Sequence, residues 1–559
     1  MSTDNQGSFA LVLHSHIPYV LSHGLWVNGL NWLTEAVAES YLPLLEVLDR
    51  LVSEGISPQI TVGLTPILLE QLADSEFPTL FESYLKTQLD FVLQNEAEFQ
   101  RAGSPHKRGL ALYWRDFYNH SMKLYNEVYE RDLISQFRRL QDEGHITLLA
   151  GSATHPYLPL IANDTGVSAQ IQLGIERYEH HFQRKPKGFW LPECGYRPEG
   201  DWAPIRELQS YANSSYRRGI ESFLSEHHIE YTFLNHAGMS ANEEVPSVNF
   251  ASNVSTRGDI EIADTIPTNS TILLGTDKQV TAFVRDPYTA AQVWSRELGY
   301  PGHQNYLEFH KKHYPGMLRY WRISLDKSSL VNKNLYEPSL AADQIKRHAA
   351  DFVELVKSSL AKQGKLSQEA PLLTAMYDTE LFGHWWHEGP QFIYEVLRKL
   401  HGTHEVKVTT CAAYLANSPT TTSQQVSEGS WGRGGGHDVW LNSRNLWVME
   451  LLYKCENLFK AVLLKFGRDA EYKPLLDALA REMMLMQSSD WQFAITNYSS
   501  ADYAEERILQ HHKQFNVLVG FLHKSAAKEL LSNAEQLQLD QIILDDRCFQ
   551  KIDLTPWAR

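Results

Sequence analysis

Short apolar runs that end in polar loops recur along the first three quarters of the chain. The clearest are FALVL, which begins at Phe9, and PLLTAMYD, which ends at Asp378. Near-continuous apolar runs of this length are typical of parallel strands that are covered on both faces. Helical spacing follows the first run in SYLPLLEVLDRLVSEG, where Gly55 is placed to end the helix. Strands that alternate with helices predict a β/α barrel or a doubly wound sheet.

Three stretches break this alternation. Helical spacing with almost no strand signal runs from about Phe77 to Glu143 and predicts a helical insertion, which we place at 70–143, within a barrel at 1–422. Runs such as LWVMELLYKCENLFKAVLL predict a helical C-terminal domain at 423–559. The segment 240–276 is polar and Asn-rich, and it follows a strand predicted to end near His236. We expect it to be a mobile loop that acts as a lid at the mouth of the barrel.

Composition narrows the class of function. The chain has 559 residues and a net charge of −16, with no basic run, so nucleic acid is not expected as a partner. No signal-peptide pattern opens the sequence and no apolar run reaches transmembrane length, so no membrane association is expected either. The four cysteines have no metal-ligand spacing, and a reduced, cytoplasmic enzyme is predicted. They are Cys194, Cys411, Cys455 and Cys548.

Two acids stand where apolar strands break into aromatic-rich loops. Glu193 lies within GFWLPECGYRP, and Asp378 opens DTELFGHWWHEG. In a β/α barrel, functional residues gather where strands end and loops begin. Two carboxylates that face each other across a cleft are the minimal apparatus for glycosidic bond chemistry. An acid held against Trp190 or Trp386 would have its neutral form favoured by desolvation, as a proton donor requires.

The histidines allow a second interpretation. His14 and His16 form HSH at the end of the first predicted strand, which is a common metal-binding arrangement in barrel hydrolases. His155, His236 and Asp378 could complete such a site. The best-placed acid would then lack a role, and neutral imidazoles can equally donate hydrogen bonds to sugar hydroxyls. A metal site and a sugar site therefore both remain open at this point.

The tryptophans favour a sugar ligand. There are 14 of them, and most fall in predicted loops rather than in core-like runs. Aromatic faces stack on the apolar faces of pyranose rings. Trp431 lies in the glycine-rich SWGRGGGHDVW, which predicts a tight loop that exposes the indole and lacks the register of a dinucleotide fingerprint. The tryptophans assigned to loops are Trp26, Trp32, Trp190, Trp294, Trp385, Trp386, Trp431, Trp440 and Trp491.

These motifs resemble those of glycoside hydrolase family 57, and within it the 1,4-α-glucan branching enzymes. HSHIPYV is similar to the first family motif, ATHPYLPLI to the tail of the second, GFWLPECGY to the third, YDTELFGHWWHEGP to the fourth and SWGRGGGHDVWLN to the fifth. The resemblance runs from about Phe9 to about Phe515. The sequence departs from the family at Thr147, where the second motif usually has a glutamate, and the loop after His236 looks longer and more polar.

The resemblance implies an incomplete (β/α)7 barrel with a helical insertion and a helical C-terminal domain that contributes to the active-site cleft. It implies Glu193 as nucleophile and Asp378 as general acid/base of a retaining reaction that transfers an α-1,4-glucan segment to a 6-OH, as in glycogen or starch synthesis. No cofactor and no metal are expected, and the protein is expected to be a monomer. The resemblance implies a glucan site formed by His14, His16, Trp26, His155, Arg285, Trp294, Trp431, Trp440 and Asp490.

Other functions remain open. An α-amylase or 4-α-glucanotransferase of the same family would use the same two acids, and only the product would distinguish it. A metal-dependent barrel polysaccharide deacetylase would be sensitive to a chelator. A non-catalytic glucan-binding protein would have no use for a complete pair of acids.

Overall fold

The computed structural model describes residues 7–25, 28–202, 208, 215–235, 270–276, 279–295, 299–324, 333–366 and 371–558. A parallel sheet at its centre has the strand order β10-β1-β2-β3-β4, and β11 (Val406–Val408) pairs with the start of β1. The predicted alternation of strands and helices is confirmed here, because each apolar run is a buried strand. The strands of the main order are β10 (Leu372–Asp378), β1 (Gly7–Ser15), β2 (Ile60–Leu64), β3 (Ile146–Gly151) and β4 (Phe189–Trp190).

A smaller sheet completes the ring of strands. β7 (Tyr231–Leu234) runs parallel to β9 (Val280–Val284), and β8 (Thr271–Leu274) is antiparallel to β9. A single bridge joins Gly188, beside β4, to Tyr231, and a second joins Arg285, after β9, to Thr374 of β10. In the described part of the chain, seven parallel strands thus form a ring, in which only a single bridge joins β4 to β7 and another joins β9 to β10. The strands of the ring are β1, β2, β3, β4, β7, β9 and β10. The predicted incomplete (β/α)7 barrel is confirmed.

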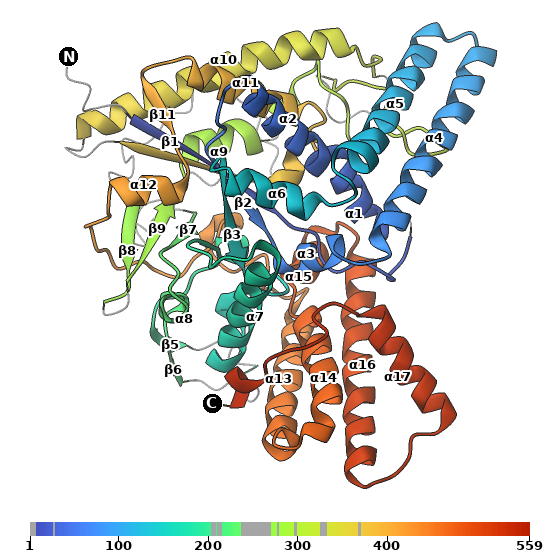
Figure 1. Ribbon diagram of the computed structural model, residues 1–559, viewed down its shortest axis with the longest axis vertical. Helices are drawn as coiled ribbons and strands as arrows, with labels where there is room; N and C mark the ends of the chain where they lie inside the picture. Colours follow the sequence, from blue (N-terminus) through green and yellow to red (C-terminus); the bar gives the residue numbers. More distant parts are fainter. Residues whose placement is uncertain are drawn as a thin grey trace.

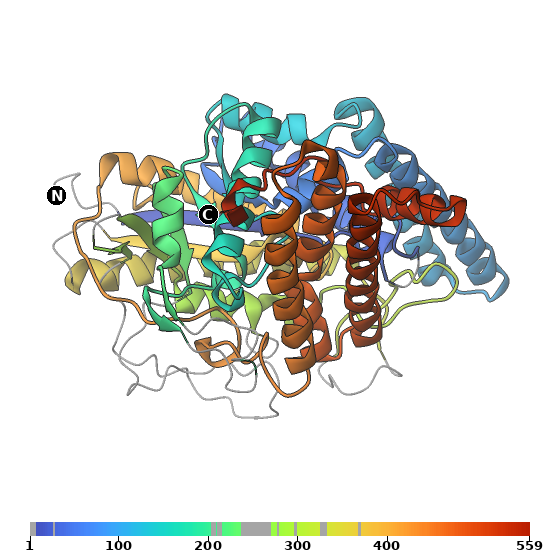
Figure 2. The ribbon, with the colours of Figure 1, turned by 90° about the horizontal axis from the view of Figure 1, so that it is seen from below.

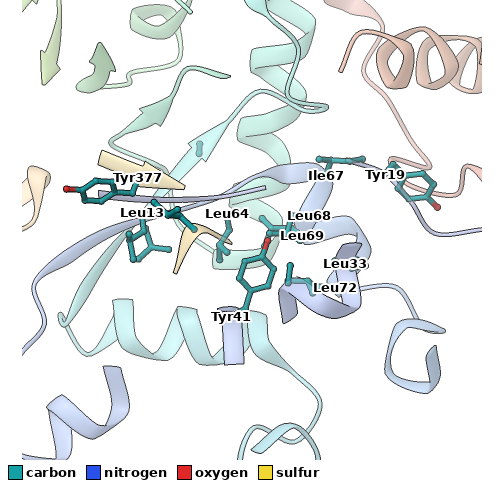
Figure 3. Packing of buried hydrophobic residues seen from close by; sticks show 14 of the residues in the cluster. Leu13, Tyr19, Leu33, Tyr41, Leu64, Ile67, Leu68, Leu69, Leu72 and Tyr377 are labelled. Carbon is teal, nitrogen blue, oxygen red and sulfur yellow. The ribbon is translucent and has the colours of Figure 1, made fainter. Parts of the chain in front are cut away.

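Helices cover the outside of this ring (Figure 1). Leu13 of β1 and Leu64 of β2 share a buried cluster with Leu68 of α3, Tyr41 and Tyr377 (Figure 3). This packing follows from strands that are apolar on both faces. The covering helices are α1 (Leu30–Ala36), α2 (Leu42–Ser53), α3 (Pro66–Leu72), α6 (Leu133–Asp142), α7 (Asp164–Phe182), α8 (Ile220–Glu226), α9 (Pro287–Trp294), α10 (Pro338–Leu366), α11 (Gly389–His401) and α12 (Cys411–Asn417).

Two groups of helices extend beyond the ring. α4 (Phe77–Arg101) and α5 (Pro105–Lys123) form an antiparallel pair that projects at the upper right of Figure 1. The next helix, α6, contacts β3 and α2, so the end of the predicted insertion returns to the barrel wall. The domain limits 1–422, 70–143 and 423–559 stay predictions. None of the described helices combines the length and apolarity needed to cross a membrane.

The C-terminal helices stand beside the barrel, orange to red in Figure 2. α16 packs against α13, α14 and α15, and the short α15 lies between this bundle and the barrel loops. This helical tail was predicted from its spacing, and it is confirmed. Its members are α13 (Leu446–Phe466), α14 (Lys473–Met486), α15 (Ser489–Asn497), α16 (Ala501–Ala526) and α17 (Asn533–Asp545).

A buried polar network fixes this bundle to the loop after β1. His23 Nε2 lies 2.7 Å from Asp546 Oδ1, His511 Nδ1 lies 2.8 Å from Glu482 Oε2, and Arg507 donates to His511 Nε2 at 2.7 Å. Burial, followed by the charge of Arg507, lowers the pKa of His511 to about 3, so His511 is neutral. Burial, followed by the charge of Asp546, raises the pKa of Glu482 well above its usual value, so Glu482 is protonated. Arg507 therefore donates to a neutral imidazole inside this buried network.

The segment predicted as a lid falls mostly outside the described residues, which resume at Ser270. Its described end is not a loop, because Thr271–Leu274 forms β8 against β9. The apolar run TILL satisfies its backbone by pairing with a strand that follows only a few residues later. The role of 240–276 as a lid stays a prediction.

Candidate active site

The two predicted acids lie at the carboxyl ends of strands in the ring. Asp378 is the last residue of β10 and pairs in register with His14 of β1. Glu193 occupies the 3-10 turn Pro192–Cys194, directly after β4. His14, the neighbour of Asp378, lies 3.0 Å from His155 between their Nε2 atoms, and His155 Nδ1 lies 3.9 Å from Glu193 Oε1, so the barrel brings the two acids to one site.

Glu193 is held by its backbone and by both carboxylate oxygens. Its φ is 61° and that of Cys194 is 50°, so two consecutive non-glycine residues adopt the left-handed region. Trp431 Nε1 donates to Oε2 at 2.7 Å, and the hydroxyl of Ser489 donates to Oε1 at 3.0 Å. The Trp431 amide also donates to the Glu193 carbonyl at 3.0 Å. These contacts fix the direction in which the carboxylate points.

Both acids have raised pKa values, for a shared reason. Burial raises the pKa of Glu193 to about 7, against the opposing hydrogen bonds from Trp431 and Ser489. Burial, followed by the charges of Glu380 and Glu193, raises the pKa of Asp378 well above its usual value. Two carboxylates in one buried site cannot easily ionise together, so near neutral pH the pair retains a proton. Asp378, which has fewer donors, is the better holder of that proton.

Three predicted histidines and one predicted aspartate form a linked group beside Glu193. The Nε2 atoms of His14 and His155 lie 3.0 Å apart, and His16 Nε2 lies 2.8 Å from Asp490 Oδ2. His155 Nδ1 lies 3.0 Å from the Ser489 hydroxyl and 3.9 Å from the nearer Glu193 oxygen. Burial lowers the pKa of both His14 and His155, which keeps these imidazoles neutral and able to donate or accept. Burial alone would raise the pKa of Asp490, but the interaction with His16 lowers it to about 2.

Arg285 and two tryptophans form another side of the site. The guanidinium carbon of Arg285 lies 5.4 Å from the ring centroid of Trp431 and 5.9 Å from that of Trp294. Its Nη1 donates to Asn235 Oδ1 at 3.2 Å, and its charge opposes the rise in the pKa of Asp378. Trp294 and Trp431 are both half-buried, so neither residue is fully enclosed by the protein.

Residues 10–426 match the family model described as Glycosyl hydrolase family 57, and residues 452–557 match one described as 1,4-alpha-glucan branching enzyme, C-terminal. The chain belongs to glycosyl hydrolase family 57. This agrees with the resemblance found in the sequence motifs, and the acids of the third and fourth motifs are the pair described above. The second match covers the helices from α13 onward.

Individual relatives agree with this assignment. The family 57 member named 1,4-alpha-glucan branching enzyme in Thermococcus kodakarensis is 37% identical over 522 residues, which are 92% of this chain and 74% of that protein. The crystal structure of the branching enzyme from Pyrococcus horikoshii superposes with a TM-score of 0.86 at 34% identity, covering 99% of this chain and 96% of that one. The α-amylase AmyC from Thermotoga maritima has a TM-score of 0.80 at 24% identity, covers 99% of both chains and shares the fold.

Several tryptophans assigned to loops are buried, some in the barrel and some in the C-terminal helical part. Trp190, Trp386 and Trp440 are 1% exposed and Trp491 is 2% exposed, so the sequence interpretation is wrong for these four. Trp190 completes β4 and stacks on His14 at 4.6 Å between ring centroids. A turn signal next to a tryptophan does not decide whether the ring points inward.

Trp440 packs against other side chains of the protein. Its ring stacks on Tyr157 with centroids 4.2 Å apart, and the Tyr157 hydroxyl lies 2.7 Å from His437 Nδ1. The two rings border a pocket that extends to Glu456 and holds about 270 Å³ of empty space, part of it open to solvent. Trp26 and His236, the other predicted members of a site, lie outside the described residues.

Three further residues, Glu380, Ser489 and Tyr41, hold the predicted site residues in place; of these, sequence reasoning missed Ser489 and Tyr41. Glu380 accepts from the backbone amide of His16 at 3.0 Å and from the hydroxyl of Tyr41. Ser489 reaches both His155 and Glu193. Glu380 and Ser489 lie within two residues of the predicted Asp378 and Asp490, and this closeness in sequence could have pointed to Ser489. Nothing in the sequence around Tyr41 connects it to the site. Thr147 lies opposite Thr61 in the first half of β3, away from the strand end at Gly151.

Two sets of side chains in the described part of the chain could hold a metal ion. One is Glu482, His511 and Asp546 in the buried network of the C-terminal bundle. The other contains His16 and His155, which were considered in the sequence, together with Asp490 rather than Asp378. Ligand atoms of His16, His155 and Asp490 all lie within 4.8 Å of one another. Two imidazoles and a carboxylate are a donor set that suits zinc. The same atoms have partners within the protein, because His16 bonds Asp490 and His155 bonds Ser489. Hydrogen bonds alone thus satisfy His16, His155 and Asp490. Treatment with a chelator distinguishes a metal site from a sugar site.

Proposed function

We propose that this protein is a retaining 1,4-α-glucan branching enzyme. The observation that carries the proposal is the pair formed by Glu193, held by two donors, and half-buried Asp378, in a chain whose branching-enzyme relatives align over nearly its full length. A catalytic pair needs one acid that is ionised and oriented and one that keeps its proton. Glu193 is oriented by its two donors, and Asp378 is the better holder of the proton.

The first step cleaves an α-1,4 bond of the donor glucan. Asp378 gives its proton to the glycosidic oxygen while a Glu193 oxygen attacks the anomeric carbon. The leaving chain departs with the proton and a covalent glycosyl-enzyme forms. Arg285 then faces an Asp378 carboxylate and stabilises it.

The second step transfers the glycosyl segment. The Asp378 carboxylate takes the proton of a 6-OH on another glucan, whose oxygen attacks the anomeric carbon and releases Glu193. Two inversions retain the anomeric configuration. Water in place of the 6-OH would give hydrolysis, so Trp294 and Trp431 favour branching if they hold the acceptor chain and exclude water.

The product distinguishes branching from hydrolysis and from 4-α transfer. We expect purified protein incubated with amylose to form α-1,6 linkages well in excess of new reducing ends, measured by proton NMR and by chain-length analysis after debranching. Asp378→Asn protein is the control for contaminating activity. Reducing ends without α-1,6 linkages would identify an amylase, and redistributed linear chains would identify a 4-α-glucanotransferase.

We expect exhaustive treatment with a chelator to leave this activity unchanged. His16 and Asp490 bond each other directly, and the neutral His14 and His155 suit sugar hydroxyls. The measurement is the branching rate before and after treatment, with zinc added back to a parallel sample. A loss that zinc restores would favour a metal-dependent hydrolase at this site instead.

We also propose that the enzyme acts as a cytoplasmic monomer on amylose-like and glycogen-like chains, without a nucleic-acid or membrane partner. The net charge of −16 disfavours polyanionic partners. All four cysteines are buried and unpaired, which suits a reducing compartment. Size-exclusion chromatography with light scattering measures the mass in solution directly.

A further inference from the structure

A second pocket lies where the α4–α5 pair meets the barrel. It holds about 330 Å³ of empty space, which includes the part that is open to solvent, and none of the residues that line it belongs to the group around Glu193 and Asp378. Side chains reach it from α1, from the turn before α2, from α4 and α5, and from the loops at 309–319 and 384. The carboxyl groups that line it have no role in the proposed reaction.

The charges in this pocket are balanced. Arg319 lies 2.9 Å from one oxygen of Glu39, and His384 Nδ1 lies 3.2 Å from the other. Although burial alone would raise the pKa of Glu39, the charge of Arg319 lowers it to about 2. Glu35 lies 3.7 Å from His384 Nδ1, and Lys312 also lines the pocket. Two acids face two cations, which favours a neutral polar ligand over a metal ion or an anion.

The pocket also contains a buried polar atom that is available to a ligand. Gln88 is 8% exposed, and its Oε1 has no hydrogen-bond partner among the described residues. A buried acceptor without a partner is unfavourable, and a ligand hydroxyl would satisfy it. Among the described residues, Glu35 pairs with His384 Nδ1 at 3.7 Å, which is longer than a hydrogen bond, so its oxygens can accept hydrogen bonds from a ligand.

Aromatic rings lie at the edge of the pocket. Phe309 lines it, and the ring of Trp385 lies against Phe309 with centroids 4.5 Å apart and planes 32° apart. Trp385 is 53% exposed, whereas its neighbour Trp386 is 1% exposed. An exposed indole is amphipathic, and beside acceptors for hydroxyl groups it matches a pyranose ring, which is apolar on its faces and polar at its edge.

We propose that this pocket is a second α-glucan-binding site, in which the exposed ring of Trp385, supported by Phe309, stacks on a sugar ring and Glu35 and Gln88 bind hydroxyls of the chain. The identity of the ligand rests on the proposed function. A site away from the reacting bond keeps a long glucan on the enzyme between transfers, so it acts on polymers more than on short oligosaccharides.

The pocket shares structure with the catalytic centre. His384 and Trp385 belong to the loop that leaves β10 after Asp378. The hydroxyl of Ser40 accepts from the His384 amide at 3.0 Å, and the next residue, Tyr41, donates to Glu380. A glucan bound in the pocket therefore rests on the same loop that carries the acid/base.

The test measures binding without turnover. In an Asp378→Asn background, we compare Trp385→Ala and Gln88→Leu with the control Tyr216→Ala, which removes an aromatic that is 64% exposed outside the pocket. Mobility in native gels containing amylose gives the dissociation constant. We expect Trp385→Ala and Gln88→Leu to weaken amylose binding by roughly three- to tenfold. Unfolding temperatures verify that each variant is folded, and Gln88→Leu keeps the side-chain volume if the tryptophan variant is perturbed.

The outcomes separate this site from the proposed function. If Trp385→Ala and Gln88→Leu bind amylose as Tyr216→Ala does, the second site is wrong, whatever the wild-type protein produces. If they bind more weakly while the wild type forms no α-1,6 linkages, the site stands and the branching assignment falls. We also expect maltotriose cleavage by Trp385→Ala with Asp378 intact to stay within about twofold of wild type, and a matching loss would contradict a remote role.

Discussion

Glu193→Gln and Asp378→Asn should each reduce transfer from amylose by about 10⁴-fold while leaving the fold intact. Gln cannot form the glycosyl ester, and Asn can neither give nor take the proton. Each amide keeps the volume of the acid it replaces, so the buried surroundings need not repack. The measurements are α-1,6 linkage formation, reducing-end release and the unfolding temperature.

An activated donor tells the two roles apart. The fluoride of a glycosyl fluoride departs without being protonated. Asp378→Asn should therefore recover formation of the glycosyl-enzyme with this donor, whereas Glu193→Gln should not. Equal loss with both donors would reject the assignment. So would a crystal structure with the carboxyl groups more than about 9 Å apart, because a retaining pair stands about 5–5.5 Å apart.

Trp431→Phe should move the acidic limb of the pH–rate profile upward by about one to two pH units. Trp431 donates to Glu193, whose pKa is about 7, and this bond favours the ionised form that attacks the anomeric carbon. Without the donor the pKa rises further, so a larger fraction of Glu193 is protonated at a given pH. A hydrogen bond to a charged group contributes about 1.5–3 kcal/mol, which is one to two pKa units.

The direction of the pH dependence distinguishes a lost hydrogen bond to Glu193 from a general loss of activity. The loss should be tenfold or more near pH 6 and should shrink as pH rises, until the proton of Asp378 is also lost. Trp385→Phe is the matched control, because that indole lies at the edge of the second pocket, and its profile should coincide with wild type. A uniform loss at all pH values would mean that Trp431 acts only by contact with substrate.

The sequence predicted the strands because they are buried on both faces and thus nearly free of polar residues. It predicted the catalytic pair because Glu193 and Asp378 interrupt such strands at their ends. It could not predict that the ring closes through single bridges near Gly188 and Arg285, because closure depends on the curvature of the whole sheet. For the same reason, the orientation of Trp190 and Trp440 could not be derived from local pattern.

The contribution of α15 was predictable only through resemblance. Ser489 and Asp490 lie about a hundred residues beyond the last barrel strand, and no local pattern connects them to His16 or Glu193. Their approach depends on the packing of α14 and α16 and on the buried contact between His23 and Asp546. Long-range contacts of this kind are set by tertiary packing rather than by propensity.

The position of Ser489 has a consequence for biosynthesis. A growing polypeptide displays Glu193 and Asp378 long before the segment that orients Glu193 leaves the ribosome. An unfinished chain thus carries both acids without the hydroxyl of Ser489 or the Asp490 partner of His16. Catalytic competence arrives only once α15 has been translated, so products truncated before Ser489 would be inert toward α-glucan.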